Sequence, residues 1–383
     1  MIARIAARRL WTTPLLVLVL FAPGTARATR PAAPAAVDWM KFRFDNVNSG
    51  VNPFETTLNP SNVQNLHIKW MVQTGSDITS SPAVVGGVLY VGSWDHSVYA
   101  LDADTGVPVW QKVTGERVLS SPTVVNGVVY VASFDDSVYA LDATNGNTIW
   151  ATPTRNWVES SPALWNGMLF VASVDSGVYG LNQATGARVW RFRMGSRSYS
   201  SAAVRNGVVY IGSRDKNVYA LGAMSGQMLW KSPTIWWVDS SPDVTDTSVY
   251  IGSFDHRLYA LNPFTGAKQW MGVTGGEIDS TPAVSGGAVY VQSADGKIYS
   301  FDATTGALRW SVPIGGEMHS SPTIAGGMVF ATSATGIVYA LDPADGSILW
   351  SYDVGGSIRS SPTVVNGMVY FGADDGKVYA FGL

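Results

Sequence analysis

Tryptophan recurs along this chain at a fixed interval of 40 residues, and this interval limits what the chain can fold into. The eight positions are Trp70, Trp110, Trp150, Trp190, Trp230, Trp270, Trp310 and Trp350. A serine keeps the same interval from Ser80 to Ser360, and a tyrosine keeps it from Tyr99 to Tyr379. Self-similarity at a period of this length indicates a repeat protein, in which each copy forms one supersecondary unit.

Residues 120–152 show what one copy contains. Short runs rich in β-branched and aromatic residues at 120–125, 127–133, 137–142 and 148–152 indicate four strands. Asn126-Gly127 is a hairpin signal, because a type I′ turn needs positive φ at both central residues. Four short antiparallel strands in 40 residues leave no room for a helix. The repeat therefore predicts an all-β fold made of propeller blades.

The two ends of the chain predict the number of blades. The first tryptophan-bearing run, near residues 66–72, precedes any complete copy, and the chain stops at Leu383 after a third strand. We expect this N-terminal strand to complete the last blade, because that closes the ring and leaves no open sheet edge. The prediction is an eight-bladed propeller over residues 73–383, with an N-terminal closing segment over residues 39–72.

The periodic residues have structural explanations. We expect the eight tryptophans to be core residues that dock one blade against the next, since burial of a large aromatic side chain is strongly stabilising. An aspartate recurs in the turn between the second and third strands, where side-chain bonds to the backbone of a tight turn explain it better than catalysis does. These aspartates are Asp95, Asp135, Asp175, Asp215, Asp255, Asp295 and Asp375.

Residues 1–28 carry the features of a secretory signal peptide in their usual order. Arg4, Arg8 and Arg9 make a basic start, residues 15–22 make a short apolar run, and residues 26–28 offer a small-residue cleavage site. We expect cleavage after Ala28 and export to the periplasm or the medium. Residues 29–38 read as a flexible leader rich in proline and alanine.

The charge and the cysteine content of the chain limit the kinds of partner that it can bind. The 25 basic and 28 acidic residues become a net charge of −7 once the four arginines of residues 1–28 are removed. Nucleic acids and anionic membranes need basic patches, so we expect neither. The chain has no cysteine, which excludes disulfides, thiolate zinc sites and a cysteine-linked lipid anchor. We expect an unanchored monomer whose partner is a protein or a small-molecule ligand.

One position varies strongly from copy to copy, namely the residue just before the periodic serine. This position begins the innermost strand of each blade, so its eight residues should surround one mouth of the channel. We call this end the upper one; it is the end with the loops between blades and the turns between the second and third strands. The eight residues are Thr79, Leu119, Glu159, Tyr199, Asp239, Asp279, His319 and Arg359. Beside them we expect Glu116, Arg117, Arg197, Glu277 and Glu317, and in the same loops Trp157, Trp236 and Trp237, which can stack on a planar ligand. The alternative interpretation is a solvated rim whose residues differ by drift.

The run Ala100-x-Asp102-x-x-Thr105-Gly106-x-x-x-Trp110 resembles the tryptophan-docking motif of the pyrroloquinoline quinone (PQQ) type propellers, the fold of quinoprotein alcohol dehydrogenases. The stretch from Trp39 to Pro53 resembles the closing segment of these proteins, and the likeness covers residues 39–383. The family contains PQQ- and Ca²⁺-dependent enzymes, and it also contains cofactor-free scaffolds such as the outer-membrane assembly lipoprotein. The resemblance therefore implies the fold and leaves the function open.

Two functional hypotheses follow. The one we favour is an exported propeller without a cofactor, which acts as a ligand- or protein-binding scaffold through its top face, because the loops are minimal and a covered quinone site needs longer ones. The other is a PQQ- and Ca²⁺-dependent dehydrogenase for an alcohol or a sugar. In that hypothesis ring geometry would make Glu159 and Asp239 metal ligands and Asp279 the base, and the quinone contacts would be Arg359, Trp157, Trp236 and Trp237.

Overall fold

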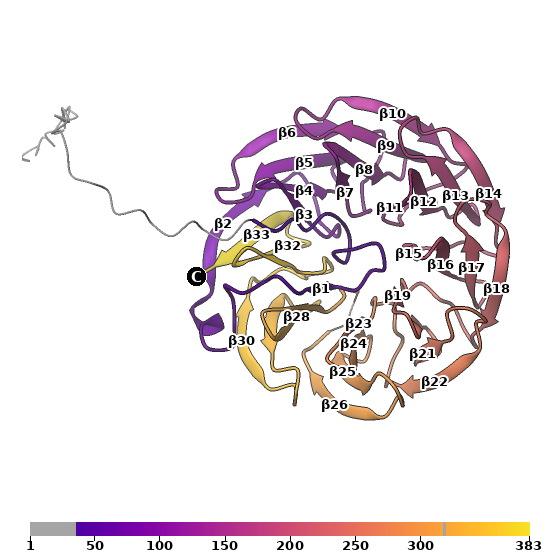
Figure 1. The fold of residues 1–383 in the computed structure, drawn as a ribbon. Helices are drawn as coiled ribbons and strands as arrows, with labels where there is room; N and C mark the ends of the chain where they lie inside the picture. The colour runs from indigo at the N-terminus through magenta and orange to yellow at the C-terminus, as the bar shows by residue number, and fades with distance from the viewer. Residues whose placement is uncertain (1–35, 317–318) are drawn as a thin grey trace, which may run out of the picture. The chain divides into compact units, whose positions relative to one another are not determined.

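The computed structural model describes residues 36–316 and 319–383, and in them it confirms an eight-bladed all-β propeller (Figure 1). The predicted signal peptide, most of the predicted leader and Glu317 lie outside the described residues. The one helix within the described part is the short 3₁₀ turn η1 (Val63–Asn65). No helix in that part of the chain is long and apolar enough to cross a membrane.

Blades 1 to 4 each form an antiparallel sheet from four consecutive strands, ordered from the channel outwards. Blade 1 contains β3 (Ala83–Val85), β4 (Val88–Gly92), β5 (Ser97–Asp102) and β6 (Pro108–Val113). Blade 2 contains β7 (Thr123–Val125), β8 (Val128–Ala132), β9 (Ser137–Asp142) and β10 (Thr148–Pro153). Blade 3 contains β11 (Ala163–Trp165), β12 (Met168–Ala172), β13 (Gly177–Asn182) and β14 (Arg188–Arg193). Blade 4 contains β15 (Ala203–Arg205), β16 (Val208–Ser213), β17 (Asn217–Gly222) and β18 (Met228–Pro233).

Blades 5 to 8 repeat this order, with the N-terminal segment joining two of them. Blade 5 contains β19 (Asp243–Val244), β20 (Val249–Ser253), β21 (Arg257–Leu261) and β22 (Lys268–Val273). Blade 6 contains β23 (Ala283–Ser285), β24 (Ala288–Ser293), β25 (Lys297–Asp302) and β26 (Leu308–Pro313). Blade 7 contains β27 (Thr323–Ala325), β28 (Met328–Thr332), β29 (Ile337–Leu341) and β30 (Ile348–Asp353), and β1 (Val51–Asn52) runs parallel to β27. Blade 8 contains β31 (Thr363–Val365), β32 (Met368–Gly372), β33 (Lys377–Gly382) and β2 (His67–Gln73).

The ring closes in blade 8, as the sequence predicts. The N-terminal strand β2 pairs antiparallel with the C-terminal strand β33, and Trp70 lies opposite Ala380. The last sheet is therefore built from both ends of the chain. Its outer strand takes the place that every other blade fills with its own fourth strand.

Within each blade, a small residue lies between two aromatic side chains in register. In blade 1, Ala100 pairs with Tyr90 on one side and with Trp110 on the other, and the two aromatic rings meet with centroids 5.8 Å apart. A larger residue at position 100 would separate these rings. The recurring alanine of the third strand thus makes room for the indole.

Seven of the periodic tryptophans also contact the next blade. The Trp110 indole N–H donates to the Ala143 carbonyl at 2.9 Å, and the Trp230 indole does the same to Pro263 at 2.9 Å. The ring lies on the turn glycine of that blade, because a Cβ added to Gly146 would fall 2.7 Å from Trp110. Each indole therefore joins one outer strand to the following turn by packing and by a hydrogen bond.

Trp350 differs because it lies at the junction where the two chain ends meet. Trp350 instead packs edge-on against Phe381 with ring centroids 5.6 Å apart, and its indole N–H has no hydrogen-bond acceptor within residues 36–316 and 319–383.

Residues 39–52 cross the lower end of the channel, a role that sequence reasoning did not assign to them. Trp39 exchanges two backbone hydrogen bonds with Val84 of blade 1. Further carbonyls of the segment accept backbone N–H groups from the innermost strands of blades 2, 4, 5 and 7, at Val124, Val204, Val244 and Ile324. Because one segment bonds to strands all around the ring, it gives the channel a floor.

Buried cations hold this floor segment in place. The Lys41 ammonium donates to Asn48 Oδ1 at 2.7 Å, and burial lowers the pKa of Lys41 to about 8. The Arg43 guanidinium donates to the carbonyls of Pro282 and Pro322, and burial lowers its pKa to about 10 against the opposing charge of Asp243. Burial also raises the pKa of Asp243 well above the usual range of a carboxyl.

The indole hydrogen bond predicts a difference between two substitutions that remove the same atoms. Trp230→Phe loses the bond to Pro263 as well as part of the ring, whereas Trp350→Phe loses ring area alone. We expect Trp230→Phe to lower the free energy of unfolding by about 1 kcal/mol more than Trp350→Phe, the usual net value of one hydrogen bond. Urea unfolding followed by circular dichroism measures both values. Equal losses would contradict the assigned role of the indole N–H.

The floor segment predicts a difference between a second pair of substitutions. Gly50 and Gly86 both have positive φ, at 64° and 58°, so an alanine is strained at either position. A Cβ on Gly50 would also fall 1.8 Å from Arg43 Nη2, while a Cβ on Gly86 meets nothing within 4 Å. We expect Gly86→Ala to lower stability by about 1 kcal/mol and Gly50→Ala by several kcal/mol, measured by urea unfolding. A similar loss for both would show that the floor tolerates displacement of Arg43.

Candidate functional site at the channel mouth

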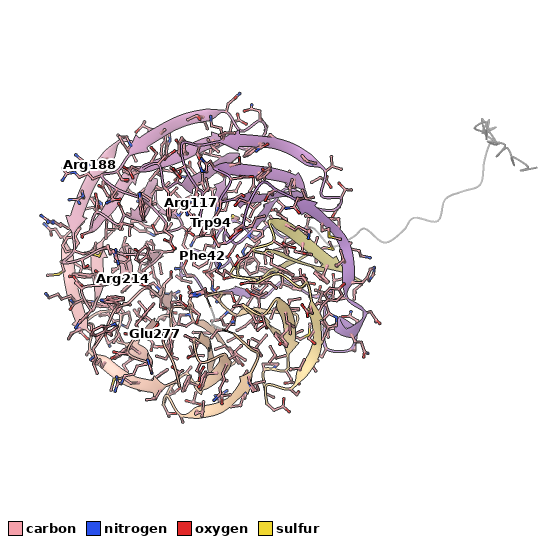
Figure 2. All side chains as sticks on the ribbon, turned by 180° about the vertical axis from the view of Figure 1, so that it is seen from behind. Phe42, Trp94, Arg117, Arg188, Arg214 and Glu277 are labelled. Carbon is pink, nitrogen blue, oxygen red and sulfur yellow. The ribbon has the colours of Figure 1, made fainter. Side chains whose placement is uncertain are left out.

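The eight variable residues before the periodic serine lie around one opening. All of them line a cavity of about 530 Å³ at the upper mouth, where Phe42 of the floor segment also lines it. Figure 2, seen from the opposite side to Figure 1, shows Phe42 near the centre of the ring, with Trp94, Arg117 and Arg214 around it and Arg188 at the outer edge. Chain positions 40 residues apart thus become neighbours around a single site.

A belt of hydrogen bonds positions these residues. At seven blade junctions, the backbone N–H of the residue after the periodic serine donates to the hydroxyl of its counterpart in the next blade, as Ser81 does to Ser121 and Ser361 does to Ser81. These bonds measure 2.8–3.0 Å. Small hydroxyl residues fit close to the axis, so the belt holds the preceding side chains at a common height.

A second ring of lining residues comes from the turns between the second and third strands, and sequence reasoning missed it. Trp94, Arg214 and Phe254 occupy the same repeat position and all line the cavity. The position reads Trp94, Phe134, Val174, Arg214, Phe254, Ala294, Ala334 and Asp374. The same comparison among copies that found the first ring could therefore have found this one.

The aspartate after this position is structural, as its periodicity predicts. Tyr99 donates its hydroxyl to Asp95 Oδ2 at 2.5 Å, and the backbone N–H groups of Gly75 and Ser97 donate to the same carboxylate. The Tyr–Asp pair recurs in every blade except blade 7, which has Thr335 at that position. There Tyr339 donates to the Ile314 carbonyl instead.

Asp239, expected as a metal ligand, is held by an arginine from the second ring. Arg214 Nε lies 3.0 Å from both carboxylate oxygens, and Nη2 lies 2.7 Å from Oδ2. The guanidinium carbon is also 4.4 Å from the Tyr199 ring and 4.5 Å from the Trp237 ring. Burial raises the pKa of Asp239, with Arg214 opposing that effect. The arrangement is a fixed ion pair with aromatic faces around it.

Arg359 and Asp279 also have partners. Arg359 Nε lies 2.8 Å from Asp374 Oδ2, its Nη2 lies 3.2 Å from Asp77 Oδ2, and its guanidinium lies 5.1 Å from the Trp94 ring. Asp279 Oδ2 lies 2.8 Å from His319 Nδ1, on the adjacent blade. The residues expected as quinone contact and base are therefore engaged with neighbours in the mouth.

Glu159 is the exception among the charged residues of the mouth. Its carboxylate has no hydrogen-bond or ion-pair partner within residues 36–316 and 319–383, and its side chain is half-buried at the wall of the cavity. Burial raises the pKa of Glu159 to about 7, and the charges of Asp239 and Asp279 add to this effect. Arg214 and Arg359 oppose it.

The three loop tryptophans lie on the upper face, outside the residues that line the mouth. Trp157 stacks on Phe134 with ring centroids 5.1 Å apart, and Trp236 stacks on Trp237 with centroids 5.7 Å apart.

The charged residues predicted beside the mouth also have neighbours. Arg117 lies 5.0 Å from the Trp94 ring, and Arg197 lies 5.6 Å from the Tyr199 ring. Glu116 lies 3.6 Å from His96, and Glu277 is exposed.

The mouth does not fit a PQQ–Ca²⁺ pair. Ca²⁺ takes six to eight oxygen ligands, with several carboxylates among them. In the described part of the chain, no group of three or more His, Asp or Glu side chains is arranged to hold a metal ion. Of the two residues expected as ligands, Asp239 is bound on both oxygens by Arg214, which leaves Glu159 as the one carboxylate without a partner.

The fold and the mouth together define a class: a closed PQQ-repeat propeller with a floored channel and one polar mouth. A family model described as "Outer membrane protein assembly factor BamB" matches residues 64–156, 123–234, 174–277 and 255–382. The chain belongs to this family. A comparison with curated proteins returned no match.

Several solved structures resemble this one. BamB from Moraxella catarrhalis is 19% identical with a TM-score of 0.74, over 83% of this chain and 100% of that one. A europium-containing methanol dehydrogenase is 16% identical with a TM-score of 0.79, over 90% and 98%. The quinohemoprotein alcohol dehydrogenase from Comamonas testosteroni is 16% identical with a TM-score of 0.76, over 90% and 80%. At these identities the likeness shows the fold alone.

The unpaired carboxyl predicts a pH-dependent stability. With a pKa of about 7 against an ordinary value of 4.5, folded Glu159 binds more proton than unfolded Glu159 between these values, so its contribution to stability falls as pH rises through this window. Glu159→Gln removes the penalty. We expect it to raise the free energy of unfolding by about 1–3 kcal/mol at pH 8 and to change little at pH 4.5.

The control for this measurement is Glu277→Gln, the same change at an exposed position of the upper face. Urea unfolding of both variants and the wild type at the two pH values gives the comparison. A loss of stability in Glu159→Gln at pH 8 would show that the carboxylate has a favourable partner after all.

Proposed function

We propose that this protein is an exported binding module that holds a partner protein against the upper face of its propeller, without a bound cofactor. The observation that carries the proposal is a set of exposed apolar side chains on this face. Trp157 is 48% exposed, Trp236 is 43% exposed and Ile235 is 59% exposed. Large aromatic residues left in contact with water beside a polar mouth are the composition of protein-binding surfaces.

The loop 235–237 offers one such surface. Ile235 and Trp236 line a second hollow of about 310 Å³ together with Phe254, His256 and Arg257. The Lys216 ammonium lies 4.4 Å from the Trp236 ring. Arg214 lies beneath Trp237, so the ion pair in the mouth supports the stacked indoles from below. Aromatic rings fixed by cations lose little side-chain entropy on binding, which favours them as anchors.

The family supports this proposal, because its model is described as that of an outer membrane protein assembly factor. Residues 1–28 support it too, since their signal-peptide pattern would bring the protein to a compartment outside the cytoplasm. We infer that the propeller serves as a scaffold on which other exported proteins are held.

The alternative, a PQQ- and Ca²⁺-dependent dehydrogenase, is not favoured, because Asp239, Asp279 and Arg359 already have partners. Titration of the purified protein with PQQ and Ca²⁺, followed by tryptophan fluorescence and by dye reduction with alcohols and sugars, tests it. We expect no saturable binding and no turnover. Tight binding that disappears in Asp239→Ala would overturn the scaffold proposal.

Site-specific photo-cross-linking tests the proposed surface. A photoreactive amino acid is placed at position 157 or 236 on the upper face, or at the exposed lower-turn positions 104 or 144 as matched controls. In the native host we expect a discrete cross-linked protein from the upper positions and none from the lower ones. Cross-links from the lower positions alone would place the binding surface on the opposite face.

A further inference from the structure

We propose that the channel mouth receives one basic side chain, an ammonium or guanidinium group of the docked partner, with Glu159 as its counter-ion. This inference rests on the proposed function and states what the partner inserts into the mouth. It draws on three observations: the charge pairing in the mouth, the aromatic residues that line it, and the charges that face Glu159.

Charge pairing leaves one place for a cation. Asp239 is paired with Arg214, Asp279 lies beside His319, and Arg359 lies between Asp374 and Asp77. An anionic ligand would have to compete with these carboxylates for their partners. A cation instead meets Glu159, a half-buried carboxylate at the wall of the cavity that has no partner within the described residues. An uncompensated charge away from water is costly, so Glu159 gains most from a ligand of opposite sign.

The lining of the cavity suits the body of a basic side chain. Phe42 lies at the floor, and Trp94, Tyr199 and Phe254 line the walls. Trp94 and Tyr199 already lie beside arginines of this chain, and the aromatic side chains of the lining pack against the methylene stem that carries an ammonium or a guanidinium. The volume of about 530 Å³ lies in the range of cavities that bind small ligands, which span roughly 300–1,000 Å³.

The groups facing Glu159 make cation binding dependent on pH. Asp239 and Asp279 favour its protonated form, Arg214 and Arg359 favour its ionised form, and with burial they place its pKa at about 7. A bound cation favours the ionised carboxylate, so binding near pH 7 releases a proton. His319 lies beside Asp279, with its Nδ1 2.8 Å from Asp279 Oδ2.

The experiment uses acetyl-arginine amide and acetyl-lysine amide as probes, with neutral acetyl-citrulline amide as the matched control. Isothermal titration at pH 6 and pH 8, in two buffers of different ionisation enthalpy, measures affinity and proton release. We expect the two cationic probes to bind about tenfold more tightly at pH 8, the change that a pKa of about 7 implies. We expect the citrulline probe not to bind.

Two variants assign the effect to a residue. Glu159→Gln should weaken binding of the arginine probe at least tenfold at pH 8 and remove its pH dependence. Glu277→Gln, at an exposed position, should change neither. Circular dichroism checks that both variants are folded. Equal binding by wild type and Glu159→Gln would overturn the inference, and so would a pH dependence that persists in Glu159→Gln, since it would belong to another group.

Probe binding tests this inference and cross-linking tests the proposed function, so that either can fail without the other. If positions 157 and 236 cross-link a partner but no cationic probe binds, the partner docks without filling the mouth, and this inference fails alone. If the probes bind but no partner is cross-linked from the upper face, the mouth is a site for small amines, and the proposed scaffold function fails. A partner cross-link that weakens in Glu159→Gln supports both.

Discussion

The contact between a tryptophan and the turn glycine of the next blade holds the ring together. A blade is a small sheet with two apolar faces, and it is stable only when both faces are covered. The indole covers part of one face and bonds to the next blade through its N–H. Because the contact repeats at almost every junction, blades with quite different upper loops stack at the same spacing. The exception is Trp350 of blade 7, which packs on Phe381 of the blade that the two chain ends share.

This repeated scaffold leaves the upper mouth free to vary. The serine belt fixes the height of the residues before it, and the floor segment closes the other end of the channel, so neither depends on the side chains of the mouth. Those side chains have instead formed pairs with one another. The pairing of Asp239 with Arg214 and of Arg359 with Asp374 turns charged residues into a rigid rim, and it leaves Glu159 as the one carboxylate of the mouth without a partner.

A stiff rim and stacked indoles suit recognition more than chemistry. Catalysis at a quinone site needs a metal with several oxygen ligands and a base that is free to take a proton, and the mouth commits those residues to each other. Binding needs rigid anchors on an accessible surface, which Trp157 and Trp236 provide. We therefore propose that the residues which made the mouth resemble an enzyme site in the sequence form part of a docking surface in the folded protein.

The sequence by itself determined the eight blades, their strands, the closure by an N-terminal strand and the ring of eight residues around one mouth. It could do so because the period of 40 residues gives every blade the same pattern of strands and turns. The strands identified in one copy therefore place those of all the others. Only the tertiary structure decided which mouth residues pair, that residues 39–52 form the floor, and that Glu159 stays without a partner. These outcomes depend on contacts between different blades, such as the ion pair of Arg214 with Asp239. They also depend on a segment outside the repeat, in which the Arg43 side chain lies close to Gly50. No periodicity encodes contacts of that kind, because they arise only when the ring brings distant residues together.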